Sequence, residues 1–86
     1  MAYRIVVTHG FEKSLKKIGQ ANAVVVMKWI VKNLEGTAHP RLHGKRLRYT
    51  LKQYWRYRIG AFRLLAQIVD DQLILELMTV AHWHET

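Results

Sequence analysis

The chain has 86 residues, enough for one small domain over residues 1–86, and it contains no cysteine, so disulfide bonds and thiolate zinc sites are excluded. Lysine and arginine total 14 against 6 acidic residues, and the resulting formal net charge of +8 favours a polyanionic partner. No run of about 18 apolar residues occurs, and the apolar run near the N-terminus is too short for a signal peptide, so we expect a cytoplasmic protein.

The first half of the chain predicts a strand and two helices. Residues 3–8 (YRIVVT) are rich in β-branched side chains and indicate a strand. Residues 11–19 (FEKSLKKIG) and 22–36 (NAVVVMKWIVKNLEG) have apolar side chains at helical spacing and end in glycine, so they predict two helices packed as an antiparallel hairpin. Two adjacent rows of the second helix predict a broad buried stripe: Ala23, Val26 and Ile30, and Val24, Met27, Val31 and Leu34.

The second half predicts strands. Residues 37–53 contain the single proline and predict a loop leading into a strand, and residues 54–60, 62–69 and 72–83 predict three strands joined by short turns. The order indicates an α+β fold, in which an N-terminal strand and a two-helix hairpin precede a three-stranded antiparallel meander, with the helices on one face. Alternation groups one face of each strand as follows: Trp55, Tyr57 and Ile59; Phe62, Leu64, Ala66 and Ile68; Leu73, Leu75, Leu77 and Thr79.

Positive charge is concentrated in one segment. Between Glu35 and Asp70 there is no acidic residue. Eight cations occupy this gap: Arg41, Lys45, Arg46, Arg48, Lys52, Arg56, Arg58 and Arg63. Aromatic side chains are interleaved with the arginines, whose planar guanidinium groups bind phosphate and stack on bases. We interpret the segment as a nucleic-acid-binding surface, because a face kept only for solubility would more often carry both signs of charge.

Three of these arginines lie on predicted strands. Alternate residues of a strand share a face, so Arg56 and Arg58 project together about 7 Å apart. Arg63 lies on the next strand, just past a tight hairpin. We therefore expect the three side chains to meet on the open face of the sheet.

The last strand carries two histidines. Strand alternation predicts that His82 and His84 share a face, that Trp83 points the opposite way, and that the histidines join the arginines on the open face. One alternative is a zinc site, which would need a third ligand and is opposed by the local positive charge. Another is that the histidines are surface residues without a function and that the tryptophan packs on a helix.

The polar residues available limit the chemistry. The sequence contains no catalytic carboxylate pair, Ser-His-Asp order, P-loop or glycine-rich dinucleotide motif. Arginine, lysine and histidine fit metal-free cleavage of RNA, in which a ribose 2′-OH attacks the phosphate with the help of a base, an acid and fixed cations. Histidine transfers protons near neutral pH. A histidine could therefore act as the base or as the acid, and we expect no metal or other cofactor.

The aromatic residues fall into two groups. Trp55 and Tyr57 share a strand face and are more often core residues than a platform for bases. Tyr49 and Tyr54 lie among the cations and are better candidates for stacking. Trp29 lies on the second predicted helix, and we interpret it as a packing residue or as part of a groove that binds a partner.

Two motifs match a known superfamily. Trp55–Arg63 has the pattern W-R-Y-R-x-G-x-[FY]-R, and Val80–His84 has the pattern V-x-H-x-[HR]. Together with FEKSLKKI at residues 11–18, they make nearly the whole chain resemble the RelE/ParE superfamily, the toxin halves of type II toxin–antitoxin pairs.

This resemblance implies one of two activities. RelE-like members are ribosome-dependent mRNA endonucleases that cut in the A site without metal, and ParE-like members inhibit DNA gyrase and are not nucleases. The terminal histidines are more similar to the RelE/YoeB branch. We therefore predict a ribosome-dependent mRNA interferase.

The same resemblance implies roles for particular residues. Arg63 would contact the scissile phosphate, and His84, or His82, would transfer a proton. Close relatives carry a glutamate base upstream of the first strand of the meander, where this sequence has no acid, so the base is left open between His43 and the two terminal histidines. Trp83 or Tyr54 would stack on a base. Basic residues would hold mRNA and ribosomal RNA, namely Lys45, Arg46, Arg48, Arg56 and Arg58.

Two other functions stay open. A ParE-type gyrase inhibitor would need no catalytic histidine. A basic RNA- or ribosome-binding module would cut nothing, and its affinity would fall steeply with salt. For a toxin of either branch we expect a cognate antitoxin, acidic and partly disordered when free. For the interferase we also expect mRNA and the 16S rRNA of the ribosomal A site as partners.

Overall fold

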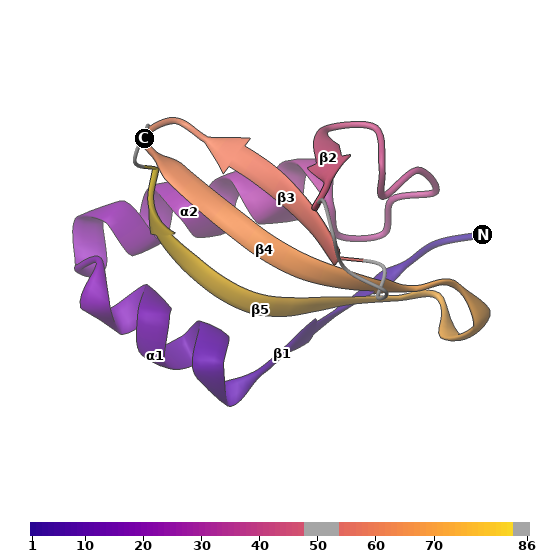
Figure 1. Cartoon of the computed structure of the whole chain (residues 1–86), viewed down its shortest axis with the longest axis horizontal. Helices are drawn as coiled ribbons and strands as arrows, with labels where there is room; N and C mark the ends of the chain where they lie inside the picture. The colour runs from indigo at the N-terminus through magenta and orange to yellow at the C-terminus, as the bar shows by residue number, and fades with distance from the viewer. Residues whose placement is uncertain (48–53, 84–86) are drawn as a thin grey trace.

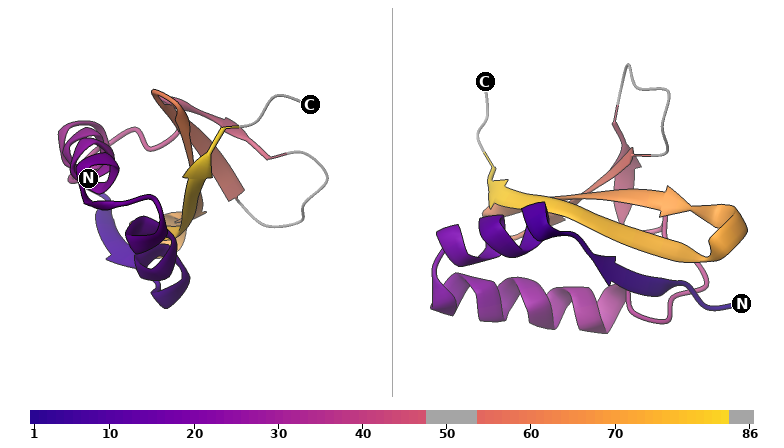
Figure 2. Two further views of the ribbon diagram at one scale, coloured as in Figure 1. Left: turned by 90° about the vertical axis from the view of Figure 1, so that its left-hand side faces the viewer. Right: turned by 90° about the horizontal axis from the view of Figure 1, so that it is seen from below.

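A single mixed sheet backed by two helices forms the molecule. The computed structural model describes residues 1–47 and 54–83. One sheet, with strand order β1-β5-β4-β3-β2, joins the described strands, and both helices cover one of its faces (Figures 1 and 2). The elements are β1 (Arg4–Val7), α1 (His9–Lys17), α2 (Gln20–Asn33), β2 (Gly44–Arg46), β3 (Tyr54–Ile59), β4 (Phe62–Val69), the 3₁₀ helix η1 (Asp70–Gln72) and β5 (Ile74–His82). Neither helix of this described part is long and apolar enough to cross a lipid bilayer.

The predicted α+β class is confirmed, but the predicted sheet was incomplete. Strands β3, β4 and β5 form consecutive antiparallel pairs, β1 adds to β5 in parallel, and β2 adds to the free side of β3. Strand β2 lies inside the segment that we expected to be a loop. Its sequence, Gly-Lys-Arg, has no alternating apolar pattern, so its pairing with β3 is not visible from local sequence.

The start and the end of α1 have clear local causes. The Thr8 hydroxyl accepts a hydrogen bond from the backbone N–H of Phe11 at 3.1 Å and so caps the helix. Lys16 and Lys17 complement the helix dipole in the last turn. Gly19 has a φ of 90°, which strains other residue types, and it turns the chain directly into α2. The helices therefore run antiparallel, as predicted (Figure 1).

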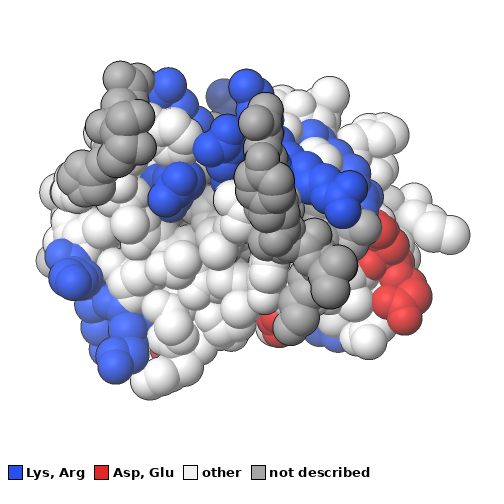
Figure 3. All heavy atoms as spheres, in the orientation of Figure 1, with Lys and Arg blue, Asp and Glu red and all other residues white. Residues whose placement is uncertain are grey.

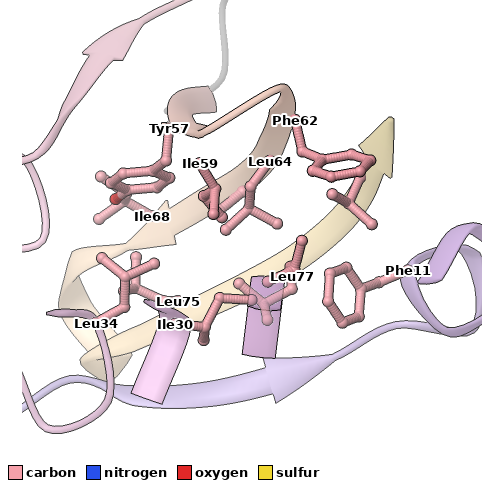
Figure 4. Packing of buried hydrophobic residues seen from close by; sticks show 13 residues of the cluster. Phe11, Ile30, Leu34, Tyr57, Ile59, Phe62, Leu64, Ile68, Leu75 and Leu77 are labelled. Atoms are coloured by element: carbon pink, nitrogen blue, oxygen red, sulfur yellow. The ribbon is translucent and has the colours of Figure 1, made fainter. Parts of the chain in front are cut away.

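The core lies between the sheet and the two helices, and α1 contributes Phe11 to it. Figure 4 shows side chains of the sheet pointing towards side chains of the helical layer. Helix α2 and its C-cap contribute only one buried row, Val26, Ile30 and Leu34. The prediction of a broad stripe was wrong, because Val24 and Val31 are 47% and 54% exposed. A helix that rests on a single sheet buries the row facing that sheet and leaves the adjacent row open.

Strand β5 contains a β-bulge. Leu65 of β4 lies opposite Thr79, whereas its neighbour Ala66 lies opposite Leu77, so the register skips Met78. An extra residue moves every later side chain to the other face of the strand.

Helix α1 holds this bulge in place. The Thr8 hydroxyl donates to the carbonyl of Leu77 at 2.8 Å, and the Val80 N–H donates to the Ser14 hydroxyl at 3.0 Å. Leu77 and Val80, three residues apart, are both buried, and Thr79 is exposed. The predicted grouping of Thr79 with Leu77 on one face was therefore wrong.

Candidate nucleic-acid interface

The open face of the sheet carries two pairs of like charges. Lys45 of β2 lies opposite Arg56 of β3, and Arg58 lies opposite Arg63 of β4. Cations directly opposite each other repel, so this arrangement costs stability until an anion lies between them. In Figure 3 lysine and arginine atoms gather over the β2–β3 side of this face, and acidic atoms lie towards the β4–β5 turn.

Three of these cations surround one aromatic ring. The guanidinium carbons of Arg56, Arg58 and Arg63 lie 5.3, 5.6 and 5.1 Å from the centre of the Trp83 ring. Each contact is within the range of a cation–π interaction. The backbone N–H of Trp83 donates to the carbonyl of Ala61 at 2.7 Å, which fixes the tryptophan to the β3–β4 turn. We call these three arginines and the tryptophan the arginine cluster; the predicted convergence of the arginines is confirmed.

His82 lies on the other face of the sheet. It is opposite Phe62, a core residue, and the two rings are 4.6 Å apart. Ala81 lies opposite Arg63 on the open face, and Trp83 follows two residues later. The prediction that His82 joins the arginines while Trp83 points away was therefore wrong. The bulge at Met78 is the physical reason, because it exchanges the two faces after residue 78.

A hollow of about 410 Å³ adjoins the arginine cluster. It lies at the edge of β3, where β2 begins with Gly44 opposite Tyr57. We call it the edge hollow. Its walls come from the loop before β2, from β2 and β3, and from the end of β5: Leu42, His43, Gly44, Lys45, Arg56, Tyr57, Arg58 and Trp83.

Buried contacts hold the loop wall of the hollow. The Tyr57 hydroxyl is buried in the core face and donates to the carbonyl of Pro40. Burial raises the pKa of this phenol, so it stays protonated and available as a donor. Trp29 of α2 touches the edge of the His43 ring, with 6.3 Å between ring centres. The loop is therefore fixed to the sheet on one side and to α2 on the other.

Arg41 ties the same loop to the far end of the sheet. Its guanidinium donates to both carboxylate oxygens of Asp70, at 3.1 and 2.8 Å, and it lies over the Trp55 ring at 5.5 Å. The Tyr3 hydroxyl donates to the same carboxylate at 2.6 Å. The hydrogen bonds from Arg41 and Tyr3 lower the pKa of Asp70. These contacts connect the N-terminal segment, the loop and η1.

The other predicted site residues divide into three groups. Tyr54 lies opposite Gln67 on the open face and is half-buried. Arg46 lies opposite Trp55, on the side of the sheet that the helices cover, so it does not share a face with Lys45, and its predicted role in RNA binding stays a prediction. Arg48 and His84, together with the stacking candidate Tyr49, lie outside the described residues. The core interpretation of Tyr57 is confirmed, and Trp55 packs against the core.

Within residues 1–47 and 54–83, no group of three or more histidine, cysteine or acidic side chains is arranged to hold a metal ion. The edge hollow as a whole was not foreseen from the sequence, because its loop wall is placed by Tyr57 and Trp29, which are distant in sequence. One sequence signal of the bulge existed: apolar spacing in β5 changes from two residues to three between Leu77 and Val80.

A comparison with family models places the chain. Residues 5–85 match the model described as the ParE toxin of the type II toxin–antitoxin system parDE. The chain belongs to this toxin family. It is thereby a type II toxin of the RelE/ParE superfamily, as the motifs predicted. No curated protein matches the sequence significantly.

Solved structures of toxins share the fold. The RelBE2 toxin–antitoxin complex from Mycobacterium tuberculosis contains a chain with a TM-score of 0.84 and 25% identity, covering 96% of this toxin and 100% of that chain. The intact Escherichia coli RelBE complex gives a TM-score of 0.75 at 20% identity, covering 98% and 100%. The archaeal RelE–RelB complex from Pyrococcus horikoshii gives 0.75 at 18% identity, covering 100% of both chains.

Proposed function

We propose that this toxin is a ribosome-dependent mRNA endonuclease that cuts in the A site. The observation that carries the proposal is the arginine cluster, in which three guanidinium groups surround the Trp83 ring on an open sheet face. Single-stranded RNA offers the matching groups, phosphates for the guanidinium groups and flat bases for the half-buried Trp83 ring. Structural similarity to RelE chains supports the same branch.

In the proposed reaction the ribose 2′-oxygen attacks the adjacent phosphorus, and the bond from phosphorus to the 5′-oxygen breaks. The products are a 2′,3′-cyclic phosphate and a 5′-hydroxyl. Arg63 stabilises the extra negative charge of the phosphorane, and Arg56 and Arg58 hold neighbouring phosphates. We assign protonation of the leaving 5′-oxygen to His84, on the resemblance described above. No step requires a metal ion from the protein.

A second function has specific support. The family model that matches is that of ParE toxins, and by resemblance this branch inhibits DNA gyrase without nuclease activity. In that case the arginine cluster would bind a protein or DNA surface and no bond would be cut. A basic module that only binds RNA or the ribosome is the third candidate. For any toxin function we propose a cytoplasmic location and a cognate antitoxin with acidic segments that cover the basic face.

The test is cleavage of mRNA on programmed ribosomes, with cut sites mapped by primer extension. We expect codon-positioned A-site cuts by the wild type. Arg63→Ala should slow cleavage by about 100-fold or more, the effect of losing one preorganised donor to a developing charge. Lys13→Ala is a matched control, because Lys13 is an exposed cation of α1, away from the open face.

Each outcome assigns the function. Cuts by the wild type that Arg63→Ala loses support the interferase. An absence of cuts, together with inhibition of purified gyrase, assigns the ParE-type function instead. Salt-sensitive ribosome binding without cuts or gyrase inhibition assigns the binding module.

A further inference from the structure

We propose that His43 is the general base of the reaction, taking the proton from the attacking 2′-OH. This inference rests on the proposed nuclease function. Its basis is the composition of the edge hollow, which adjoins the arginine cluster and contains one histidine.

A base must offer a lone pair to a proton. Lys45, Arg56 and Arg58 line the hollow as cations, which only donate hydrogen bonds. The Trp83 indole also only donates. Arginine in particular is not deprotonated in proteins, so the arginine cluster binds phosphate but cannot start the reaction.

The remaining polar group of the hollow is already engaged. The Tyr57 hydroxyl is buried and donates to the Pro40 carbonyl. Leu42 and Gly44 have no polar side-chain atoms. Among the described side chains that line the hollow, the imidazole of His43 is therefore of the residue type that most often serves as a general base.

The position of His43 fits this role. Its side chain is exposed and lines the same hollow as Arg56 and Arg58, so an RNA strand held by these arginines would lie beside it. Trp29 of α2 supports one edge of the ring, which restricts its orientation. Three charged side chains line the same hollow as His43, namely Lys45 of β2 and Arg56 and Arg58 of β3. These same cations would hold the phosphate whose 2′-OH neighbour loses its proton.

His82 does not compete for this role. It is exposed at the end of β5, but its ring lies against Phe62, on the side of the sheet away from the arginine cluster. Two groups then account for the two proton transfers of the cleavage reaction. The His43 ring nitrogen accepts the 2′-OH proton as the new bond to phosphorus forms, and a separate acid gives a proton to the 5′-oxygen as the old bond breaks.

The experiment measures single-turnover cleavage on programmed ribosomes across a range of pH. We expect His43→Ala to cut about 100-fold or more slowly, within the usual contribution of a general base, and to lose the rise of rate with pH on the acidic side. Ribosome binding, measured by cosedimentation, should stay unchanged. The matched control is His39→Ala, since His39 is an exposed histidine of the same loop that lines a different hollow beside Tyr3.

Thermal melts identify any variant that fails to fold. His43→Gln keeps a polar side chain of similar size without a titratable nitrogen, and it replaces the alanine variant in that case. If the wild type cuts and both His43 variants cut within about threefold of it, far below the range for a general base, this inference is overturned and the nuclease stands. If the wild type cuts nothing, the proposed function fails first and the base assignment with it.

Discussion

Removal of the Ser14 hydroxyl tests whether α1 fixes the bulge that orients the end of β5. In Ser14→Ala the Val80 N–H, which lies 3.0 Å from that hydroxyl beside a buried side chain, loses its acceptor. An unsatisfied buried donor costs about 1–3 kcal/mol. Alanine is a better helix former than serine by about 0.5 kcal/mol, which offsets part of the loss. The net loss is about 1.5 kcal/mol, or about 6–12 °C in Tm for a domain of this size.

The assay is thermal unfolding followed by circular dichroism, with Lys13→Ala as control because it is an exposed position of the same helix. We expect the control to stay within about 0.5 kcal/mol of the wild type. Amide chemical shifts should also move at Met78, Val80 and Trp83, because the bulge sets their register. A melting temperature for Ser14→Ala within about 2 °C of the control would refute the reasoning, since it would show that Val80 finds another acceptor.

Three further predictions concern the hollow, the cluster and the Asp70 contacts. A Cβ on Gly44 would lie 2.4 Å from Trp55 Cδ1 and 2.7 Å from the carbonyl oxygen of Arg56. We therefore expect Gly44→Ala to lower the free energy of unfolding in chemical denaturation by about 1–3 kcal/mol and to reduce the protection of β2–β3 amides from hydrogen exchange. Unchanged protection would contradict the prediction. Trp83→Phe keeps an aromatic ring, and the indole N–H that it removes has no partner among the described residues. Trp83→Ala loses three cation–π contacts of about 0.5–1 kcal/mol each, so we expect RNA affinity to fall far more in this variant than in Trp83→Phe. Equal losses of affinity in gel-shift assays would contradict the prediction. The pKa of Asp70 is lowered in the folded state, so its ionised carboxylate stabilises the fold above its unfolded pKa, and this stabilisation is lost as pH falls through the folded pKa. Because Arg41 and Asp70 are both well exposed, Asp70→Asn should lower the free energy of unfolding by at most about 1 kcal/mol at about pH 7. The difference in Tm from the wild type should vanish at about pH 2. A difference that persists in acid would show that the contact is not ionic.

Sequence periodicity predicted the parts of the fold that repeat regularly. Strand β4 was placed at its observed bounds, because Phe62, Leu64, Ala66 and Ile68 alternate strictly with outward side chains. The convergence of Arg56, Arg58 and Arg63 followed from the same alternation and a short hairpin turn. Both inferences needed only local geometry.

Features that depend on contacts between distant segments were not predicted. The bulge at Met78 is stabilised by Thr8 and Ser14, more than sixty residues earlier in the chain, and it moved His82 to the covered face. A strict period of two could not show this. Within β5, the wrong predictions of side-chain facing are therefore confined to the residues after the bulge, because one extra residue moves each of them to the opposite face.

The short strand β2 was missed for a similar reason. Gly44 fits there because Trp55 of β3 occupies the space that a side chain would need. The reason for a glycine at this position therefore lies in the partner strand, and the residues adjacent to it in the sequence do not reveal it. The same applies to His43, whose place in the hollow depends on Trp29.

The pairing of β1 with β5 has a consequence for synthesis of the toxin. Arg4 lies beside Ile74 and Val7 beside Leu77, so the first strand made has its place in the sheet only after the last strand has been made. Contacts of such long sequence separation form late and slow the folding of a domain. Trp83 follows β5, so the arginines have no ring to gather around until that strand has left the ribosomal tunnel. A nascent chain therefore carries the basic residues of the toxin without its assembled surface.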